Sequence, residues 1–427
     1  MTALTRRRGE ILDAAAALFA REGYRGTSMR EVATAAGIQA GSLYHHFPSK
    51  EAIAVELVQE YHADLDRTVQ DFGPGRVPGG PGSVAAGRLG PVAALRAFAR
   101  DVAEVSGRNR AALQISMYDA PTSASLSLKT VVRAESASLN EHWRSLIGGA
   151  IAAGAIDQRI DPHILRHVLR DTLPMAGVMV WERGAPDGGM AAVADCVTSI
   201  ILDGLAAPEP APPEYSGDSA AIGVVTEARA RWAAQARARL QERPGMILDV
   251  ARTQFAQRGF EATTMRDIAD AAGLSAGNLY RYFGSKDAMV TAILSEFSDR
   301  LLAAYQEVLT IGTSAVESLE AICLLLDQAG REFSREIDML KGNGKVLSLD
   351  VASHYRHGAR ARYALLVSLI ENGVATGEVR RAGEAALVAS CVREIMWAPM
   401  RSLAPISPAR VREFIRRAIL AGAARPR

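Results

Sequence analysis

Apolar and polar residues near the start of the chain alternate with the period of an amphipathic α-helix. Four apolar residues fall at positions i, i+4, i+7 and i+8, on one helix face: Ile11, Ala15, Leu18 and Phe19. Gly23 ends this predicted helix. Ser28 and Glu31 then form a capping box, in which each side chain accepts a backbone N–H, and this motif predicts the start of a second helix.

A short third helix is predicted because Ala40, Leu43 and Phe47 recur at i, i+3 and i+7. Gly37 supplies a tight turn before it, and Ser49 caps a fourth helix. Two short helices joined by a glycine turn make a helix-turn-helix, whose second helix can enter the major groove of DNA.

The same pattern occurs a second time along the chain. Residues 11–24 match residues 247–260 at an offset of 236 (247 minus 11), and the match continues without a gap to Lys50 and Lys286. Roughly half of the aligned positions are identical, far above chance for a repeat of this length. The chain is therefore one helical unit duplicated.

A weaker match later in the two copies shows where they differ in length. Residues 145–147 and 368–370 share Ser-Leu-Ile at an offset of 223 (368 minus 145), so the first copy holds 13 residues (236 minus 223) that the second lacks. We expect them in the Gly- and Pro-rich run from Gly73 to Pro91, which cannot continue a helix. A Pro-rich run after residue 206 joins the copies as an extended, semi-rigid spacer.

Composition and charge exclude several classes of protein. Hydrophobic residues make up 48% of the 427 residues, which is enough to build packed cores. No apolar run of about 18 residues predicts a membrane span, and the first residues are expected to form an amphipathic helix rather than a secretion signal. Because the net charge is only +2, any DNA-binding surface must be local.

The cysteines add no chemistry to this picture. Cys196, Cys323 and Cys391 are far apart, a spacing that favours neither a disulfide framework nor a zinc site. Such cysteine usage is typical of a reducing cytoplasm, and a cytoplasmic protein is expected.

The repeated motifs resemble the DNA-binding signature of the TetR family of regulators. The resemblance lies in Gly-Tyr-x-x-Thr-Ser-Met-Arg-Glu-Val-Ala from Gly23, in Gly-Ser-Leu-Tyr-His-His-Phe from Gly41, and in Gly-Asn-Leu-Tyr-Arg-Tyr-Phe from Gly277. It covers roughly 50 residues in each copy. The resemblance implies an all-α fold of two TetR-like units, each with a three-helix DNA-binding head and a larger helical bundle for effector binding and dimerisation.

On this interpretation the chain divides into five parts. They are a first helix-turn-helix DNA-binding domain at 1–53, a first helical effector and dimerisation domain at 54–206, a Pro-rich linker with a connecting helix at 207–236, a second helix-turn-helix domain at 237–289, and a second effector and dimerisation domain at 290–427.

The resemblance also implies DNA contacts residue by residue. Three pairs match family positions that hold phosphates: Thr27 and Thr263, Tyr44 and Tyr280, and Lys50 and Lys286. Gly41 and Gly277 let the helix approach DNA closely. Four residues match exposed positions that face base edges: Ser42, His45, Asn278 and Arg281. Ser28 and Thr264 complete the predicted DNA-binding set; Arg6, Arg7 and Arg8 either contact phosphates or form a merely soluble terminus.

The region after each head carries candidates for an effector site. Aromatic and long apolar side chains, which line ligand cavities, are Met117, Tyr118, Trp143 and Trp181 in the first unit and Tyr355, Tyr363, Met396, Trp397 and Met400 in the second. Arg170 and Arg393, each followed by an acidic residue, are candidates for holding a polar ligand group. The alternatives are a helix-bundle core for the first set and an interface salt bridge for the two arginines.

Motifs for catalysis or metal binding are weak. His354 and His357 are spaced like two metal ligands, but no carboxylate or cysteine stands at a useful spacing, so an exposed helix face is preferred. The sequence shows no phosphate loop, dinucleotide fingerprint or nucleophile elbow. We expect no enzyme activity, no cofactor and no metal.

The sequence therefore predicts a DNA-binding transcriptional regulator. The favoured interpretation is a repressor that an apolar or amphipathic small molecule releases from double-stranded operator DNA. The alternative is a constitutive or architectural DNA-binding protein without an effector. Because one chain supplies both heads, we expect the two units to pair with each other as an intramolecular pseudo-dimer. A further homodimer of two such chains is left open. Since the two heads differ, we expect the operator to be an imperfect palindrome.

Overall fold

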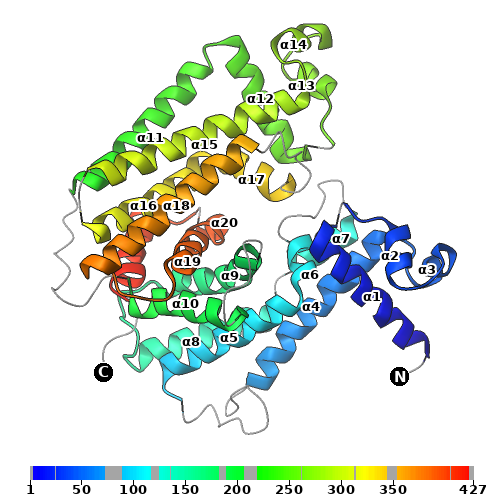
Figure 1. The fold of residues 1–427 in the computed structure, drawn as a ribbon, viewed down its shortest axis with the longest axis horizontal. Coiled ribbons are helices and arrows are strands. Elements are labelled where there is room, and N and C mark those ends of the chain that lie inside the picture. Colours follow the sequence, from blue (N-terminus) through cyan, green and yellow to red (C-terminus); the bar gives the residue numbers. More distant parts are fainter. Residues whose placement is uncertain are drawn as a thin grey trace.

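The computed structural model is an all-α fold (Figure 1). It describes residues 3–24, 26–72, 89–116, 125–134, 136–181, 189–205, 219–260, 262–311, 314–343, 353–403 and 405–422. The Gly- and Pro-rich run and the Pro-rich spacer expected from the sequence lie largely outside these ranges. Among the described residues, no helix is both long and apolar enough to cross a membrane.

The first unit consists of ten helices within the described ranges. They are α1 (Ala3–Glu22), α2 (Met29–Ala35), α3 (Ala40–His46), α4 (Lys50–Phe72), α5 (Pro91–Arg108), α6 (Arg110–Gln114), α7 (Leu126–Arg133), α8 (Ala137–Ala152), α9 (Pro162–Trp181) and α10 (Gly189–Asp203). We call α1–α3 the first head and the remainder the first body.

The second unit repeats this order after one additional helix. Its elements are α11 (Ala220–Arg239), α12 (Arg243–Arg258), α13 (Met265–Ala271), α14 (Ala276–Tyr282), α15 (Lys286–Thr310), α16 (Ala315–Glu332), α17 (Ser334–Asn343), α18 (Ser353–Thr376), α19 (Ala385–Trp397), α20 (Met400–Leu403), α21 (Pro408–Phe414) and the π-helical η3 (Ile415–Leu420). The second head is α12–α14, and α11 packs along α15 and α16 of the second body.

The two units differ where one helix is broken in the first and continuous in the second. Ser136 caps α8 by accepting the N–H of Leu139, so the chain breaks between α7 and α8. The matching position in the second unit is Ala359 (136 plus 223), which has no capping side chain. The single long helix α18 therefore runs through this position.

The units pair through their last helices. Helices α9 and α10 of the first unit pack on α19 of the second, and α10 also packs on η3. One hydrophobic core runs through this seam, with fully buried side chains from both units, among them Ile200 and Ile419. Backbone hydrogen bonds cross it: the Leu205 N–H donates to Ile419 O (2.9 Å) and the Arg380 N–H donates to Leu205 O (2.7 Å).

Two glycines allow the close approach at this seam. Gly204 follows α10 with φ +77°, and Gly422 follows η3 with φ +90°. A Cβ on Gly204 would collide with the Leu420 carbonyl oxygen, and a Cβ on Gly422 would collide with the Asp203 backbone. Both positions therefore require glycine for conformation and for space.

Candidate functional site

Each head orients its third helix through the predicted cap and turn. In the first head, the Ser28 N–H donates to Glu31 Oε2 (2.7 Å) and the Glu31 N–H donates to Ser28 Oγ (3.2 Å). Thr264 and Asp267 form the same box in the second head. These hydrogen bonds lower the pKa of both carboxyl groups, so the boxes stay ionised and intact. The predicted Ser28–Glu31 capping box is confirmed, and the second head repeats it.

Helices α3 and α14 each bury one side and expose the other. Leu43 and Leu279 are fully buried in the heads. On the opposite faces, Tyr44 is 54% exposed and Tyr280 is 52% exposed. The other exposed residues of these faces are Gly41, Ser42 and His45 on α3, and Gly277, Asn278 and Arg281 on α14. A Cβ added to Gly41 or Gly277 meets no atom within 4 Å, so nothing within the described residues requires glycine there.

The two threonines expected to hold phosphates lie inside the heads. Thr27 and Thr263 are buried, and their hydroxyls donate to Gly23 O (3.0 Å) and Gly259 O (2.7 Å). These side chains face inward and fasten the loop that precedes the second helix of each head, and a phosphate contact from either threonine stays a prediction.

The two lysines stabilise the same loops. Lys50 Nζ donates to Tyr24 O and Thr27 O (both 2.7 Å) and lies 4.6 Å from the centre of the Tyr24 ring. Lys286 Nζ donates to Phe260 O (2.6 Å) and lies 4.1 Å from the Phe260 ring. Each ammonium group is therefore anchored by carbonyl and cation–π contacts at the start of the connecting helix. A phosphate contact from either lysine stays a prediction.

Among the N-terminal arginines, Arg8 joins two helices of the first unit. It pairs with Glu56 of α4 through two nitrogens, donates to His46 O (2.6 Å) at the end of α3, and stacks 4.0 Å from the Phe47 ring. The hydrogen bond to Glu56 raises the pKa of the Arg8 guanidinium. Arg6 and Arg7 pair with Glu10 on the same helix. Arg8 is thus a structural clamp between head and body.

The second head is attached to its body differently, through buried charge. Arg252 of α12 is 2% exposed and donates to Glu336 of α17 (2.7 Å) and to Glu296 of α15 (2.5 Å). Arg239 of α11 and Arg300 of α15 also pair with Glu296. The core of the second head forms one hydrophobic cluster with residues of α15 and with Met339 of α17, separate from the main core, whereas the core of the first head is continuous with that main core.

Several of the predicted effector residues that the structure describes are packed within the helical bodies. Trp143 is fully buried against Phe98, with ring centres 4.7 Å apart, as core packing requires. Tyr363 donates its hydroxyl to Ala386 O (2.8 Å), and Met396 is buried in the second body. Met117 and Tyr118 lie outside the described residues, and the side chains of Trp181 and Met400 are not described either.

The two candidate arginines form ion pairs with their neighbours. Arg170 pairs with Asp171 (2.5 Å), and both contact Ser402 of the second unit across the seam. Arg393 pairs with Glu394. For Arg170 the interface interpretation therefore fits the structure better than ligand binding. His354 pairs with Asp299 (2.7 Å), and no group of three potential metal ligands occurs within the described ranges.

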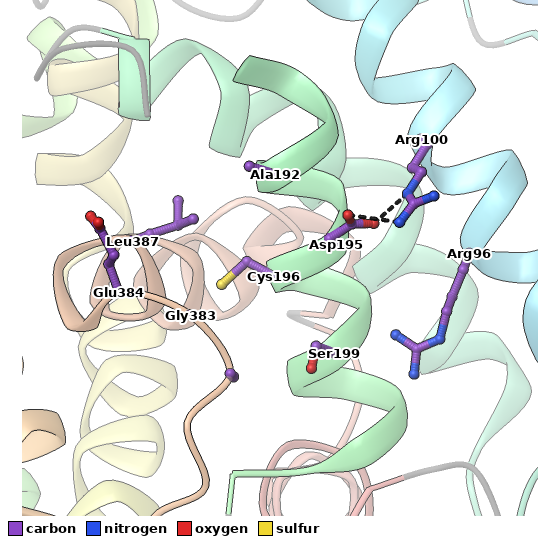
Figure 2. Close-up of a pocket in the computed structure, with 10 residues that line it drawn as sticks. Arg96, Arg100, Ala192, Asp195, Cys196, Ser199, Gly383, Glu384 and Leu387 are labelled. Carbon is purple, nitrogen blue, oxygen red and sulfur yellow. Dashed lines mark hydrogen bonds and ion pairs between the residues drawn. The ribbon is translucent and has the colours of Figure 1, made fainter. Parts of the chain in front are cut away.

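A cavity of about 460 Å³ lies at the seam between the units (Figure 2). Arg96 and Arg100 of α5 and Asp195, Cys196 and Ser199 of α10 form one wall; the other wall consists of Ala382, Gly383, Glu384 and Leu387 at the start of α19. Arg100 pairs with Asp195, as Figure 2 shows, and Arg96 pairs with Asp203. None of the predicted effector residues lines it. This cavity could not be predicted from local sequence patterns, because it exists only where the two units meet.

Comparisons with known proteins agree with the duplicated heads. The family model for bacterial regulatory proteins of the tetR family matches residues 11–57 and 247–293. The HTH-type transcriptional repressor KstR2 of Mycolicibacterium smegmatis is 33% identical over 163 residues, which cover 38% of this chain and 80% of that protein. KstR2 of Rhodococcus jostii is 33% identical over 37% of this chain and 78% of its own length.

Solved structures give the same proportions. The ketosteroid transcriptional regulator KstR2 of Mycobacterium tuberculosis matches 43% of this chain and 96% of its own, with 26% identity and a TM-score of 0.40. The probable transcriptional regulatory protein RHA5900 matches 43% of this chain and all of its own, with 29% identity and a TM-score of 0.39. The coverage of the two KstR2 sequences shows that each of those relatives has about the length of one of the two units.

Proposed function

The chain belongs to the TetR family of bacterial regulatory proteins, and on this premise we propose that it is a transcriptional repressor whose two heads bind one operator together. The observation that carries the proposal is the matched exposed faces of α3 and α14. Each presents a glycine, a tyrosine and two polar side chains over a fully buried leucine. Such a face fits the major groove of DNA.

The seam between the units supports binding by a single chain. In family members of one unit, two heads require two chains, whereas α9 and α10 here already pack on the helices of the second unit. Figure 1 shows the first head at the right of the view and the second head at the top, with the paired helices α10 and α19 away from both. This arrangement lets both heads face one stretch of DNA.

Differences between the two faces favour an asymmetric operator. Arg281 and Asn278 of α14 form paired hydrogen bonds to guanine and adenine respectively, while Ser42 and His45 of α3 make weaker and less selective contacts. None of these four side chains forms a hydrogen bond or ion pair with other described residues, so they are available to bases. We infer an imperfect palindrome whose stricter half is bound by the second head.

Release by a small molecule is the second part of the proposal. The curated relatives are named repressors, and a repressor without an effector would be constitutive. The effector is proposed to bind within one of the two helical bodies, because each body connects its DNA-binding head to the seam between the units. A chain that binds its operator equally in the presence of every candidate compound would instead support the constitutive alternative.

Binding-site selection with the purified full chain tests the DNA-binding part. Arg281→Ala is expected to cost about 1 to 3 kcal/mol and to relax the preference at one guanine of one half-site only. His45→Ala, the control at the equivalent face of the first head, is expected to cost less and to act on the other half-site. A fully symmetric site, with both variants affecting both halves equally, would contradict the proposal.

A further inference from the structure

Two buried cysteines meet across the seam between the units. Cys196 lies on α10 of the first unit and Cys391 on α19 of the second, and both are free thiols, 2% and 0% exposed. Helices α10 and α19 pack on each other, and a hydrogen bond joins the two thiols. The fold therefore brings together two cysteines that stand 195 positions apart in the sequence (391 minus 196).

Cys196 is also part of the wall of the seam cavity. Leu387 of α19 lines the same cavity, and Cys391 lies one turn further along the same face of that helix. Figure 2 shows the Cys196 sulfur directed away from α10 toward the start of α19. A Cβ added to Gly383, which precedes α19, would lie 3.9 Å from this sulfur. A small molecule in the cavity therefore meets Cys196 first, with Cys391 next to it in the seam.

The surroundings of the two thiols give them different roles. The hydrogen bond with Cys196 and burial raise the pKa of the Cys391 thiol well above its usual range, so this thiol stays protonated near neutral pH. Oxidants react with thiolates that they can reach. Cys196, which lines the cavity, is thus the thiol that an oxidant attacks. Cys391 is the neighbour that captures the oxidised sulfur, because it is already in contact with it.

We propose that a hydroperoxide oxidises this pair of cysteines to a disulfide that joins the two units covalently. First, the Cys196 sulfur attacks the peroxide, the O–O bond breaks, and Cys196 sulfenic acid and an alcohol (or water, from hydrogen peroxide) are formed. The Cys391 sulfur then attacks the sulfenic sulfur. The S–S bond forms, the S–O bond breaks, and the hydroxide leaves with the Cys391 proton as water. The two thiols together supply the two electrons that reduce the peroxide.

The disulfide fixes the helices through which the units pair. It closes a loop that contains the spacer and the whole second head, which restricts the unfolded chain and stabilises the folded one. It also prevents α10 from separating from α19. The Leu205 N–H, which donates to Ile419 O across the seam, then exchanges with solvent more slowly. This inference goes beyond the proposed function, because it depends on neither the operator nor an effector.

Oxidation of the full chain by hydrogen peroxide tests the proposal. After treatment, remaining thiols are blocked in denaturant, and the chain is digested without reductant for mass spectrometry. We expect a cross-linked peptide pair that contains Cys196 and Cys391 and is lighter by two hydrogen atoms than the reduced peptides. The intact chain should run faster on a non-reducing gel, melt at a higher Tm and exchange the Leu205 amide more slowly. Dithiothreitol should reverse each change.

Two results of this experiment would overturn the proposal. One is a folded, peroxide-treated chain in which Cys196 and Cys391 are recovered as free thiols or as separate sulfinic acids. The other is a disulfide that joins two chains instead of the two units of one chain.

Substitution of each cysteine identifies the pair. Cys391→Val introduces the residue that the first unit has at this position, the buried Val168 (391 minus 223), so the chain should fold without forming the cross-link. Oxidation should then stop at Cys196 sulfenic acid, which dimedone labels. Absence of this label would contradict the assignment of Cys196 as the first thiol to react.

Cys323→Ala is the matched control. Cys323 of α16 is also fully buried, and burial raises the pKa of its thiol to about 12. This variant keeps both seam cysteines, so peroxide should cross-link it and raise its Tm as in the parent chain. A rise in Tm that persists in Cys391→Val, or a cross-link that is lost in Cys323→Ala, would refute the seam disulfide.

Discussion

Arg252 is expected to hold the second head on its body, and its replacement by leucine measures how strongly. Its guanidinium is almost fully buried and donates to Glu336 and Glu296. Glu296 also forms ion pairs with Arg239 and Arg300. Glu336, in contrast, pairs only with Arg252 among the described residues. Arg252→Leu therefore leaves Glu336 as a single buried carboxylate without a cation.

The size of the effect follows from this imbalance. Removing one partner of a buried ion pair costs about 3 to 5 kcal/mol, and we expect the lower end, about 3 kcal/mol, because Glu296 stays compensated. Leucine itself fits the helix, since the first head has Ala16 at this position (252 minus 236). Arg252→Leu combined with Glu336→Leu removes both charges, and replacement of a buried pair by apolar residues is often neutral or stabilising. The double variant should recover most of the loss.

Hydrogen exchange of the full chain is the suitable assay because it resolves the two heads. Protection of α12–α14 should fall by about 3 kcal/mol in Arg252→Leu and return in the double variant, while α1–α3 serves as the internal control. A loss below about 1 kcal/mol, or a double variant as unstable as the single one, would show that the charges do not hold the head.

Three further outcomes are expected. Burial raises the pKa of the Asp101 carboxyl group to about 7. Between about pH 4 and pH 7 the native state therefore holds a proton that the unfolded chain has released. The free energy of unfolding consequently falls as the pH rises through this range. Asp101→Asn should remove this slope in thermal melts and gain about 1 kcal/mol at pH 8, allowing for its partial exposure. Gly204→Ala should cost about 2 kcal/mol or more, because of its positive φ and the collision with Leu420 O, and an unchanged Tm would contradict the geometry of the seam. Lys286→Ala should weaken DNA binding at all sequences and expose the loop at Phe260 to proteolysis; equal affinity with an equal salt slope would mean that the second head does not dock.

Local patterns predicted the heads well because their signals lie within a few residues. Ser28 with Glu31 and Thr264 with Asp267 specify a helix start by themselves, and Gly37 and Gly273 both adopt a φ of +65°. The inward hydroxyl of Thr27 was not predictable in this way. Its acceptor, Gly23 O, becomes available only when the loop folds back over the end of α1.

Features of the bodies depend on contacts between distant residues. The seam needs Gly204 to meet Leu420, residues that no periodicity connects. Arg362 does carry a signal in the sequence, because it lies on the face of α18 that buries Leu366 and Ile370, four and eight residues later. A charged residue on an apolar helix face indicates a buried ion, but the sequence does not show which group is its partner.

The number of chains bound to one operator decides whether a single chain supplies both DNA-binding heads. Native mass spectrometry of the full chain, alone and with its selected operator, gives this number without assumptions about shape. We expect one chain in solution at micromolar concentration and one chain on each operator, with both Arg281→Ala and His45→Ala weakening that same complex. A stable dimer that carries four heads, or two chains on each operator with only one head of each in contact, would contradict it.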